Sequence, residues 1–264
     1  MYRMDFPCGF VPFPFGSGFL FSEAIMGIVW NEQTLRWFLD ASAYTGYDRA
    51  LAALLRPLFP VGGTLCDLGC GAALTDFELS PDCRFVTCVD SSPEAVSFVR
   101  NEAARRHIPN LTARCMDAAE VPEQFDTVMT LFHGSPETFD AYCKKAQKVF
   151  LIVTRRERLG QFGPENRRIS KRGDAASMRL FLDARSIRYS YQETELEHGQ
   201  PLRTIEDAAA FVRAYAAPMP EAELLRYLDS ALLKTGREDF PYYLPNRKKL
   251  GLFVIRRDEN EGVL

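Results

Sequence analysis

Residues 64–77 read TLCDLGCGAALTDF. The stretch begins with the pattern of a short buried strand, Thr64–Leu68, and continues through Gly69 and Gly71 into a helical pattern. In parallel α/β sheets, a glycine turn between a strand and a helix lies at the carboxyl end of the strand, where ligands bind. Asp67 is the residue to explain, because an acid inside an apolar strand must serve either a ligand or the start of the next helix.

Strand and helix patterns alternate along the chain on both sides of this stretch. We expect strands over 64–68, 84–89, 111–115, 125–131, 149–154, 187–197 and 250–255. We expect helices in the gaps over 73–79, 93–106 and 136–146, and later over 175–184, 205–215 and 221–235. Repeated β-α-β units indicate a parallel sheet with helices on both faces. The sequence therefore predicts an α/β fold with a doubly wound, mostly parallel seven-stranded sheet, whose last strand pairs antiparallel and follows a helical insertion.

The regions outside the alternating pattern define the expected domain organisation. Residues 1–25 interleave six phenylalanines with prolines and glycines, which break helices and strands and match a signal peptide poorly. We interpret them as a poorly ordered leader or as the product of an upstream start codon that is not used; the alternative is an aromatic flap over the active site. Residues 26–60 are expected to form helices covering the cleft. Residues 61–264 form the main domain, with substrate-side insertions at 155–174 and 200–240.

Composition excludes several classes of protein. The chain has 264 residues, of which 47% are hydrophobic and 25% charged, enough for one large domain. The net charge of −3 and the pI of about 5.8 provide no overall basic field for nucleic acid or an anionic membrane. No apolar run reaches the roughly 18 residues of a membrane helix. Seven scattered cysteines without C-x2-C pairs favour a reducing, cytoplasmic location and predict no metal site.

The glycine turn fits one class of cofactor better than another. A dinucleotide site uses a third glycine for close helix packing, but the bulky Leu74 stands at that position. A pyrophosphate at the helix N-terminus is also disfavoured by the negative charge of Asp67. A dinucleotide oxidoreductase is therefore disfavoured. A cofactor with a positively charged amino acid tail would instead benefit from the acid.

The segment Asp67-Leu68-Gly69-Cys70-Gly71-Ala72-Ala73 resembles motif I of the class I S-adenosylmethionine-dependent methyltransferases, with Ala73 in place of the third glycine. The resemblance covers about residues 50–155. It implies a Rossmann-like methyltransferase fold, S-adenosyl-L-methionine as the cofactor and methyltransferase activity. It also implies that Asp67 serves the ammonium group of the methionine moiety. Gly69, Cys70 and Gly71 would let the backbone approach the cofactor.

The next two strand ends carry residues that match the same family. Asp90 ends the second strand, with Ser91 after it, and an acid there can accept hydrogen bonds from both ribose hydroxyls. Asp117 and Ala118 follow the third strand, where the family contacts adenine. Each acid also has a structural interpretation. Asp90 would be the N-cap of the next helix, and Asp117 an ordinary turn residue.

The fourth strand ends at Phe132, His133 and Gly134, where the family places residues that face the transferred methyl. His133 is the candidate general base, because it is the only histidine at a predicted strand tip and its pKa range suits that role. The alternative is a polar loop residue beside the cofactor. His107 and His198 are interpreted as surface residues.

Aromatic residues before the glycine turn are candidates for binding the acceptor. Tyr44 and Tyr47 are the candidate substrate-binding residues, and Trp30 and Trp37 offer the same chemistry, including cation–π contact with a sulfonium. Helix packing explains Trp37 equally well. Residues 241–245, PYYLP, are interpreted as the turn into the last strand, the alternative being a substrate-facing loop.

The acceptor itself has no obligatory signature. Basic residues within 155–172 favour a solvated loop, with an anionic acceptor or RNA as alternatives. No N-P-P-[FY] signature of amino-directed nucleic-acid methylation follows the fourth strand. We therefore predict a methyltransferase acting on a small molecule, with nucleic acid and membrane partners disfavoured and the oligomeric state undefined. An RNA or protein methyltransferase is one alternative, and a non-catalytic S-adenosylmethionine-binding sensor or scaffold is another.

Overall fold

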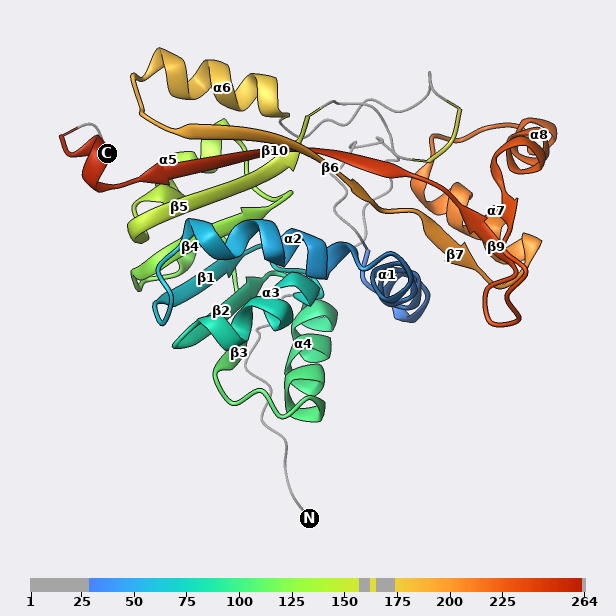
Figure 1. The fold of residues 1–264 in the computed structure, drawn as a ribbon, viewed down its shortest axis with the longest axis horizontal. Coiled ribbons are helices and arrows are strands. Elements are labelled where there is room, and N and C mark those ends of the chain that lie inside the picture. The colour runs from blue at the N-terminus through green and yellow to red at the C-terminus, as the bar shows by residue number, and fades with distance from the viewer. Residues whose placement is uncertain (1–28, 157–161, 165–173, 263–264) are drawn as a thin grey trace, which may run out of the picture.

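A computed structural model describes residues 29–156, 162–164 and 174–262 of the chain. The expected leader at 1–25 and most of the insertion at 155–174 lie outside the described residues. Figure 1 shows a large sheet with helices against it and, at one end of β6 (Ser190–Glu197) and β10 (Arg247–Arg256), a smaller lobe.

The large sheet contains seven strands in the order β3-β2-β1-β4-β5-β10-β6. Its strands are β1 (Thr64–Leu68), β2 (Phe85–Asp90), β3 (Leu111–Cys115), β4 (Phe125–Leu131), β5 (Ala146–Arg155), β6 (Ser190–Glu197) and β10 (Arg247–Arg256). The first five pair in parallel, and β10 pairs antiparallel with both β5 and β6. The predicted doubly wound, mostly parallel seven-stranded sheet is confirmed.

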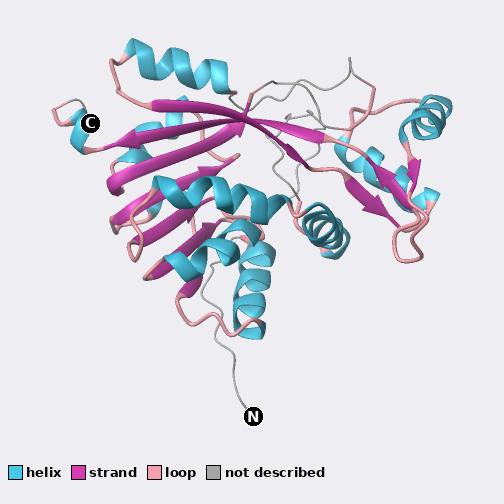
Figure 2. Ribbon diagram, in the orientation of Figure 1, coloured by secondary structure: helices cyan, strands magenta, loops and turns pink. Residues whose placement is uncertain are grey.

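Helices cover both faces of this sheet (Figure 2). One apolar core contains residues of α2 (Tyr47–Leu55), α3 (Leu74–Leu79) and α4 (Pro93–Arg105), and the other those of α5 (Phe139–Cys143) and α6 (Ala175–Ala184). Side chains alternate between the faces of a strand, so Leu65 joins the first core and Cys66 the second. This burial on both faces explains why the central strands are continuously apolar.

The insertion between β6 and β10 forms the smaller lobe. It contains β7 (Gln200–Leu202), α7 (Ile205–Tyr215), α8 (Glu221–Ala231), β8 (Leu233–Lys234) and β9 (Tyr242–Leu244). The two helices were expected, but the three-stranded sheet β7-β9-β8 was not. The interpretation of 241–245 as a turn is wrong, because Tyr242–Leu244 pair with both neighbouring strands. Strands of two or three residues are too short to show a period.

Helix α1 (Glu32–Thr45) joins the lobe to the main domain (Figure 1). Trp37 is buried in the core of the lobe, and its indole N–H donates to Asp207 Oδ1 at 2.9 Å. Arg36 forms an ion pair with the same carboxylate at 2.6 Å, and Gln200 Nε2 donates to the Trp37 carbonyl at 3.1 Å. Helix packing therefore accounts for Trp37, and an acceptor-binding role for it is not supported.

We predict that Asp207→Ala lowers the free energy of unfolding by about 1.5–3 kcal/mol, because two donors on α1 lose a charged acceptor. The measurement is urea denaturation. Glu206→Ala is the control, since Glu206 is the exposed neighbour on the same helix. Equal effects of the two substitutions would show that α1 is held by apolar packing alone.

Candidate active site at the carboxyl edge of the sheet

The turn after β1 is fixed by its backbone. The N–H groups of Gly69 and Cys70 both donate to the Val89 carbonyl, at 2.7 and 3.0 Å, which ties the turn to β2. Gly69 and Gly71 have φ values of 81° and 54°, in the left-handed region that favours glycine. Ala73, at the position of the missing third glycine, is also left-handed, with φ 51°. The turn therefore keeps its shape at the cost of local strain.

Two aromatic rings pack directly on the glycines. A Cβ added at Gly69 would lie 2.1 Å from the His133 ring, and one added at Gly71 would lie 2.6 Å from the Trp30 ring. Trp30 is itself held edge-on against Phe38 of α1, at 5.3 Å between ring centroids. Any side chain at either glycine would displace these rings, so the glycines are required for contact as well as for conformation.

The Asp90 carboxylate lies at the end of β2, beside the glycine turn. Its Oδ2 accepts from the Gly71 N–H at 2.8 Å, and its Oδ1 accepts from the Ser92 N–H at 2.9 Å. The N-cap of α4 is Ser92, whose hydroxyl accepts from Ala95 N–H, so the alternative that Asp90 caps this helix is wrong. A carboxylate has about four acceptor positions. Asp90 therefore has acceptor positions left for two hydroxyl donors. The next residue, Ser91, is exposed.

Asp117 and Ala118 follow β3. Asp117 is the N-cap of a short 3-10 turn, where its Oδ1 accepts from Ala119 N–H at 2.7 Å, while Ala118 is buried. The structural interpretation of Asp117 as a turn residue is thus confirmed. Its second oxygen has no protein donor among the described residues, so its contact with adenine stays a prediction.

Asp67 lies beneath the turn and is fully buried. Its side chain lies on the face of β1 covered by α3, next to the buried Asp76, and as carboxylates neither has a hydrogen-bond donor among the described residues. Burial, and then the charge of Asp76, raise the pKa of Asp67 well above its ordinary value; burial raises the pKa of Asp76 to about 7. Two adjacent buried acids cannot both ionise, so one proton joins them at neutral pH.

This arrangement fits S-adenosylmethionine. The backbone of the glycine turn lies at the carboxyl end of β1, under the rings of His133 and Trp30, and the buried acid pair beneath it offers negative charge to an ammonium group. Asp90 offers acceptors to a ribose diol. A pyrophosphate at this helix N-terminus is disfavoured, because the buried carboxylates of Asp67 and Asp76 lie beneath the turn and Leu74 is buried at the start of α3. Direct contact between the Asp67 carboxylate and the cofactor is not supported by its complete burial; its charge would act through the turn.

Phe132 and His133 leave β4 in an unusual conformation. Phe132 has φ 59°, and its N–H donates to the Val153 carbonyl at 2.8 Å. This kink brings the His133 ring over Gly69. His133 Nε2 lies 3.0 Å from the Tyr142 hydroxyl oxygen, and the two rings stack at 5.7 Å between centroids. Sequence reasoning missed Tyr142, because nothing in its local pattern distinguishes it from a core residue of α5.

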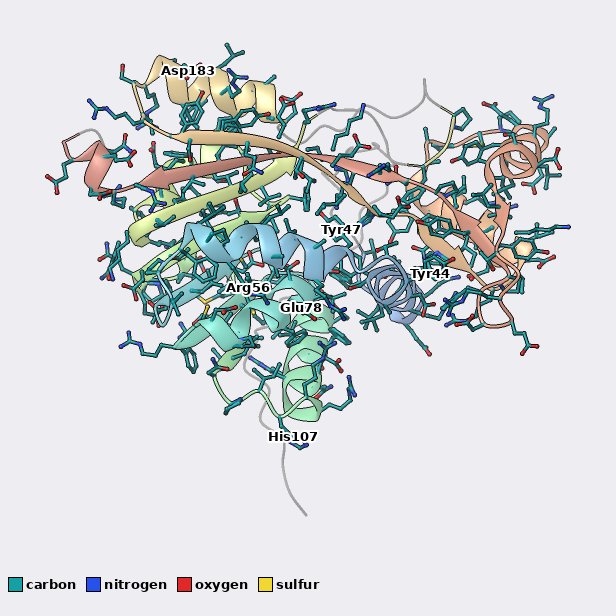
Figure 3. All side chains as sticks on the ribbon, viewed as in Figure 1. Tyr44, Tyr47, Arg56, Glu78, His107 and Asp183 are labelled. Atoms are coloured by element: carbon teal, nitrogen blue, oxygen red, sulfur yellow. The ribbon has the colours of Figure 1, made fainter. Side chains whose placement is uncertain are left out.

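The two candidate tyrosines lie in different environments (Figure 3). Tyr44 stacks on Tyr243 of the small sheet, at 5.0 Å between centroids. Tyr47, at the start of α2, is buried and packs edge-on against His198 at 4.5 Å. The interpretation of His198 as a surface residue is wrong: burial lowers its pKa well below the ordinary value. His107 is exposed at the end of α4, as predicted.

Comparison with known proteins identifies the class. Residues 65–150 match the family model described as a methyltransferase domain. The YcgJ protein of Bacillus subtilis is 13% identical, with a TM-score of 0.51, over 79% of this chain and 98% of that one. Magnesium protoporphyrin IX methyltransferase of Synechocystis, determined with bound S-adenosylmethionine, is 14% identical, with a TM-score of 0.45, over 88% of each chain. A putative RNA methyltransferase of Pyrococcus horikoshii is 13% identical, with a TM-score of 0.48, over 79% and 82%.

The chain therefore carries a class I methyltransferase domain with the Rossmann-like fold of that family. It is an S-adenosylmethionine-dependent methyltransferase. In the described part of the chain, no helix has the length and apolar character needed to cross a membrane. Within the same residues, no three His, Cys, Asp or Glu side chains are grouped to hold a metal ion.

The acid pair predicts a pH dependence of stability. Asp76 titrates near pH 7 when folded and near 4 when unfolded, so the folded protein holds a proton that the unfolded chain has lost. The stabilisation of the folded protein by the proton on Asp76 is fully present below about pH 4, and it is lost as the pH rises to about 7. We expect the difference in unfolding free energy between the wild type and Asp76→Asn to fall across this window, by at most about 1.4 kcal/mol per pH unit.

Denaturant unfolding of the unliganded protein at several pH values measures this difference. The exposed Asp229→Asn on α8 is the control and should leave the profile unchanged. A constant difference between wild type and Asp76→Asn would mean that Asp76 is ionised in the folded protein throughout.

Proposed function

We propose that this methyltransferase acts on a small molecule, held at the carboxyl edge of the sheet between the glycine turn and the start of α2. The observation that carries the proposal is the burial of Tyr47 and Lys248 beside Phe132. Tyr47 is 4% exposed and Lys248 is 8% exposed, and the Lys248 Nζ lies over the rings of both Tyr47 and Phe132. Surroundings that are buried and rich in aromatic rings suit a small ligand better than a polymer.

The cofactor would lie across the ends of β1 and β2. Its methionine end would rest on the Gly69–Gly71 turn above Asp67, and its ribose hydroxyls would donate to Asp90. Bound there, S-adenosylmethionine supplies an electrophilic methyl group on a positively charged sulfur. Trp30 and Phe132 would border that position, and aromatic faces stabilise a nearby cation.

The chain's part in the reaction would be mainly to position the acceptor. Methyl transfer is a displacement that depends on the alignment of the acceptor atom with the methyl group, which orientation can supply. His133 is held on Gly69 by Tyr142, so it would shape the floor of the site. The neutral imidazole can also take a proton, but a base is needed only for an acceptor that arrives protonated.

We predict that Asp90→Ala weakens binding of S-adenosylmethionine by about tenfold to a hundredfold, because two hydroxyl donors lose a charged acceptor. Isothermal titration calorimetry measures the affinity. Glu94→Ala is the control, because Glu94 is exposed on the first turn of the helix that follows. Since Asp90 also accepts from the backbone, circular dichroism must first show that the variant is folded. A folded variant with unchanged affinity would remove Asp90 from the ribose site.

His133→Ala should reduce turnover less than about a hundredfold and leave the pH profile of the rate unchanged, as expected of a positioning residue. Tyr142→Phe, which keeps the stacked ring but loses the hydroxyl, should have a smaller effect of the same kind. Steady-state kinetics over pH, with KM and kcat separated, is the measurement. A larger loss in His133→Ala that added imidazole restores would establish a general base instead.

The acceptor class is tested by supplying S-adenosylmethionine with a labelled methyl group to the protein in an extract of its source cells. The label should appear in the low-molecular-mass fraction. Its recovery in RNA or in protein would contradict the proposal, and its absence from every fraction, with the cofactor bound, would favour a non-catalytic binder.

A further inference from the structure

Lys248 is a buried cation that the cofactor site does not use. It lies near the start of β10, beyond the carboxyl ends of the parallel strands, and only 8% of its surface is exposed. Its Nζ is 3.7 Å from the centroid of the Phe132 ring and 5.0 Å from that of Tyr47. In the described part of the chain, no carboxylate lies within ion-pair distance of this nitrogen and none of the hydrogen bonds involves it. An ammonium without an anion is costly to bury.

Other charged and titratable groups lie around the Lys248 ammonium. The acid whose charge acts on Lys248 is Asp48 of α2, which already accepts from the Thr75 hydroxyl at 2.7 Å. Arg155 at the end of β5 adds a second positive charge, and burial together with Arg155 lowers the pKa of Lys248 to about 7, against the opposing effect of Asp48. His198, which follows β6, is held neutral by burial. Among the described residues of this cluster, Asp48 is thus the acid whose charge acts on Lys248.

The same cluster has polar atoms without partners. The Tyr47 hydroxyl and His198 Nδ1 are both buried and lack hydrogen-bond partners among the described residues. Buried polar groups in folded proteins are normally paired, and unpaired ones often mark a place that a ligand completes. The Lys248 Nζ lies over the ring of Phe132, and the next residue, His133, packs its ring on Gly69 of the turn. The unpaired cluster thus adjoins the position where chemistry would occur.

We propose that the methyl acceptor is an acidic oxygen, a carboxylate or a phenolate, and that Lys248 binds it as its counter-ion. This inference rests on the proposed function and specifies its substrate class. An oxyanion would neutralise Lys248, offer acceptors to the Tyr47 hydroxyl, and be attracted to the cofactor's positive sulfur. A neutral amine would leave the lysine without an anion.

The electron and proton balance of the reaction follows from this assignment. A lone pair of the acceptor oxygen forms the new C–O bond while the S–CH3 bond breaks and leaves its electron pair on sulfur. A carboxylate transfers no proton. A phenol that arrives protonated gives its proton to the neutral amine of Lys248, which then stabilises the phenolate. The products are a methyl ester or a methyl ether and S-adenosylhomocysteine.

The test uses the protein saturated with S-adenosylhomocysteine and 4-nitrophenol as the probe, because the ionised form of 4-nitrophenol is yellow. We expect the probe to bind in its ionised form and to shift its apparent pKa downward. Lys248→Met should weaken this binding by about tenfold to a hundredfold, as expected for loss of a charged partner. Lys249→Met, on the neighbouring residue of β10 whose side chain points to the opposite face, is the matched control and should bind normally.

Benzoate and benzamide distinguish the source of the oxyanion. Displacement of the probe by benzoate, but not by the uncharged benzamide, supports a carboxylate acceptor; binding of 4-nitrophenolate with no competition by benzoate supports a phenolate. The proposal is overturned if benzoate and benzamide bind equally and no nitrophenolate binds. It is also overturned if Lys248→Met and Lys249→Met bind 4-nitrophenol with equal affinity. Calorimetry with S-adenosylhomocysteine separates this failure from a failure of the proposed function. Retained cofactor binding leaves the proposed function intact, and lost binding in the wild type contradicts both.

Discussion

A single carbonyl group fixes the geometry of the site. The Val89 carbonyl accepts from both Gly69 and Cys70, and this pair of bonds holds the turn after β1 against the end of β2. The same contact sets Gly71 beside Asp90, whose carboxylate then accepts from the Gly71 N–H. Since His133 packs on Gly69, the tip of β4 is positioned by the same turn. The ends of three neighbouring strands are thereby held in one arrangement.

Groups of opposite charge are buried at two places around these strand ends. Beneath the turn, Asp67 and Asp76 are buried together, and with one proton between them the pair carries a negative charge that would attract a cation above. Near the start of β10, Lys248 is buried against the rings of Phe132 and Tyr47. The methyl donor brings a positive sulfur and a positive amino group, and the proposed acceptor brings an anion. Each ligand would therefore meet charge of the opposite sign, one from below the turn and the other from β10.

The sequence predicted the parts of the structure that local patterns specify. The strands 64–68, 111–115 and 125–131 match the observed bounds, because each is a short apolar run between turn residues. The glycine turn was also predictable, since glycine is needed where φ is positive and space is short. The family model and the fold support the cofactor class that these residues indicated.

Features that depend on contacts between distant segments were not predictable. His198 and Lys248 are each polar residues near a strand end, and only the packing of α2 against them shows that they are buried. Tyr142 gains its importance from His133, on a different element. Likewise, the sequence placed Asp67 correctly on β1 but did not reveal Asp76 beside it. The small sheet was missed because its strands have too few residues to show a period.

The most direct test of this account is the structure of the protein in complex with S-adenosylhomocysteine. We expect the ribose hydroxyls within hydrogen-bond distance of the Asp90 carboxylate, and the amino acid end of the ligand on the Gly69–Gly71 turn above Asp67. The sulfur should lie on the side of Phe132 that faces the turn. A ligand bound elsewhere, or one whose ribose does not contact Asp90, would contradict the account.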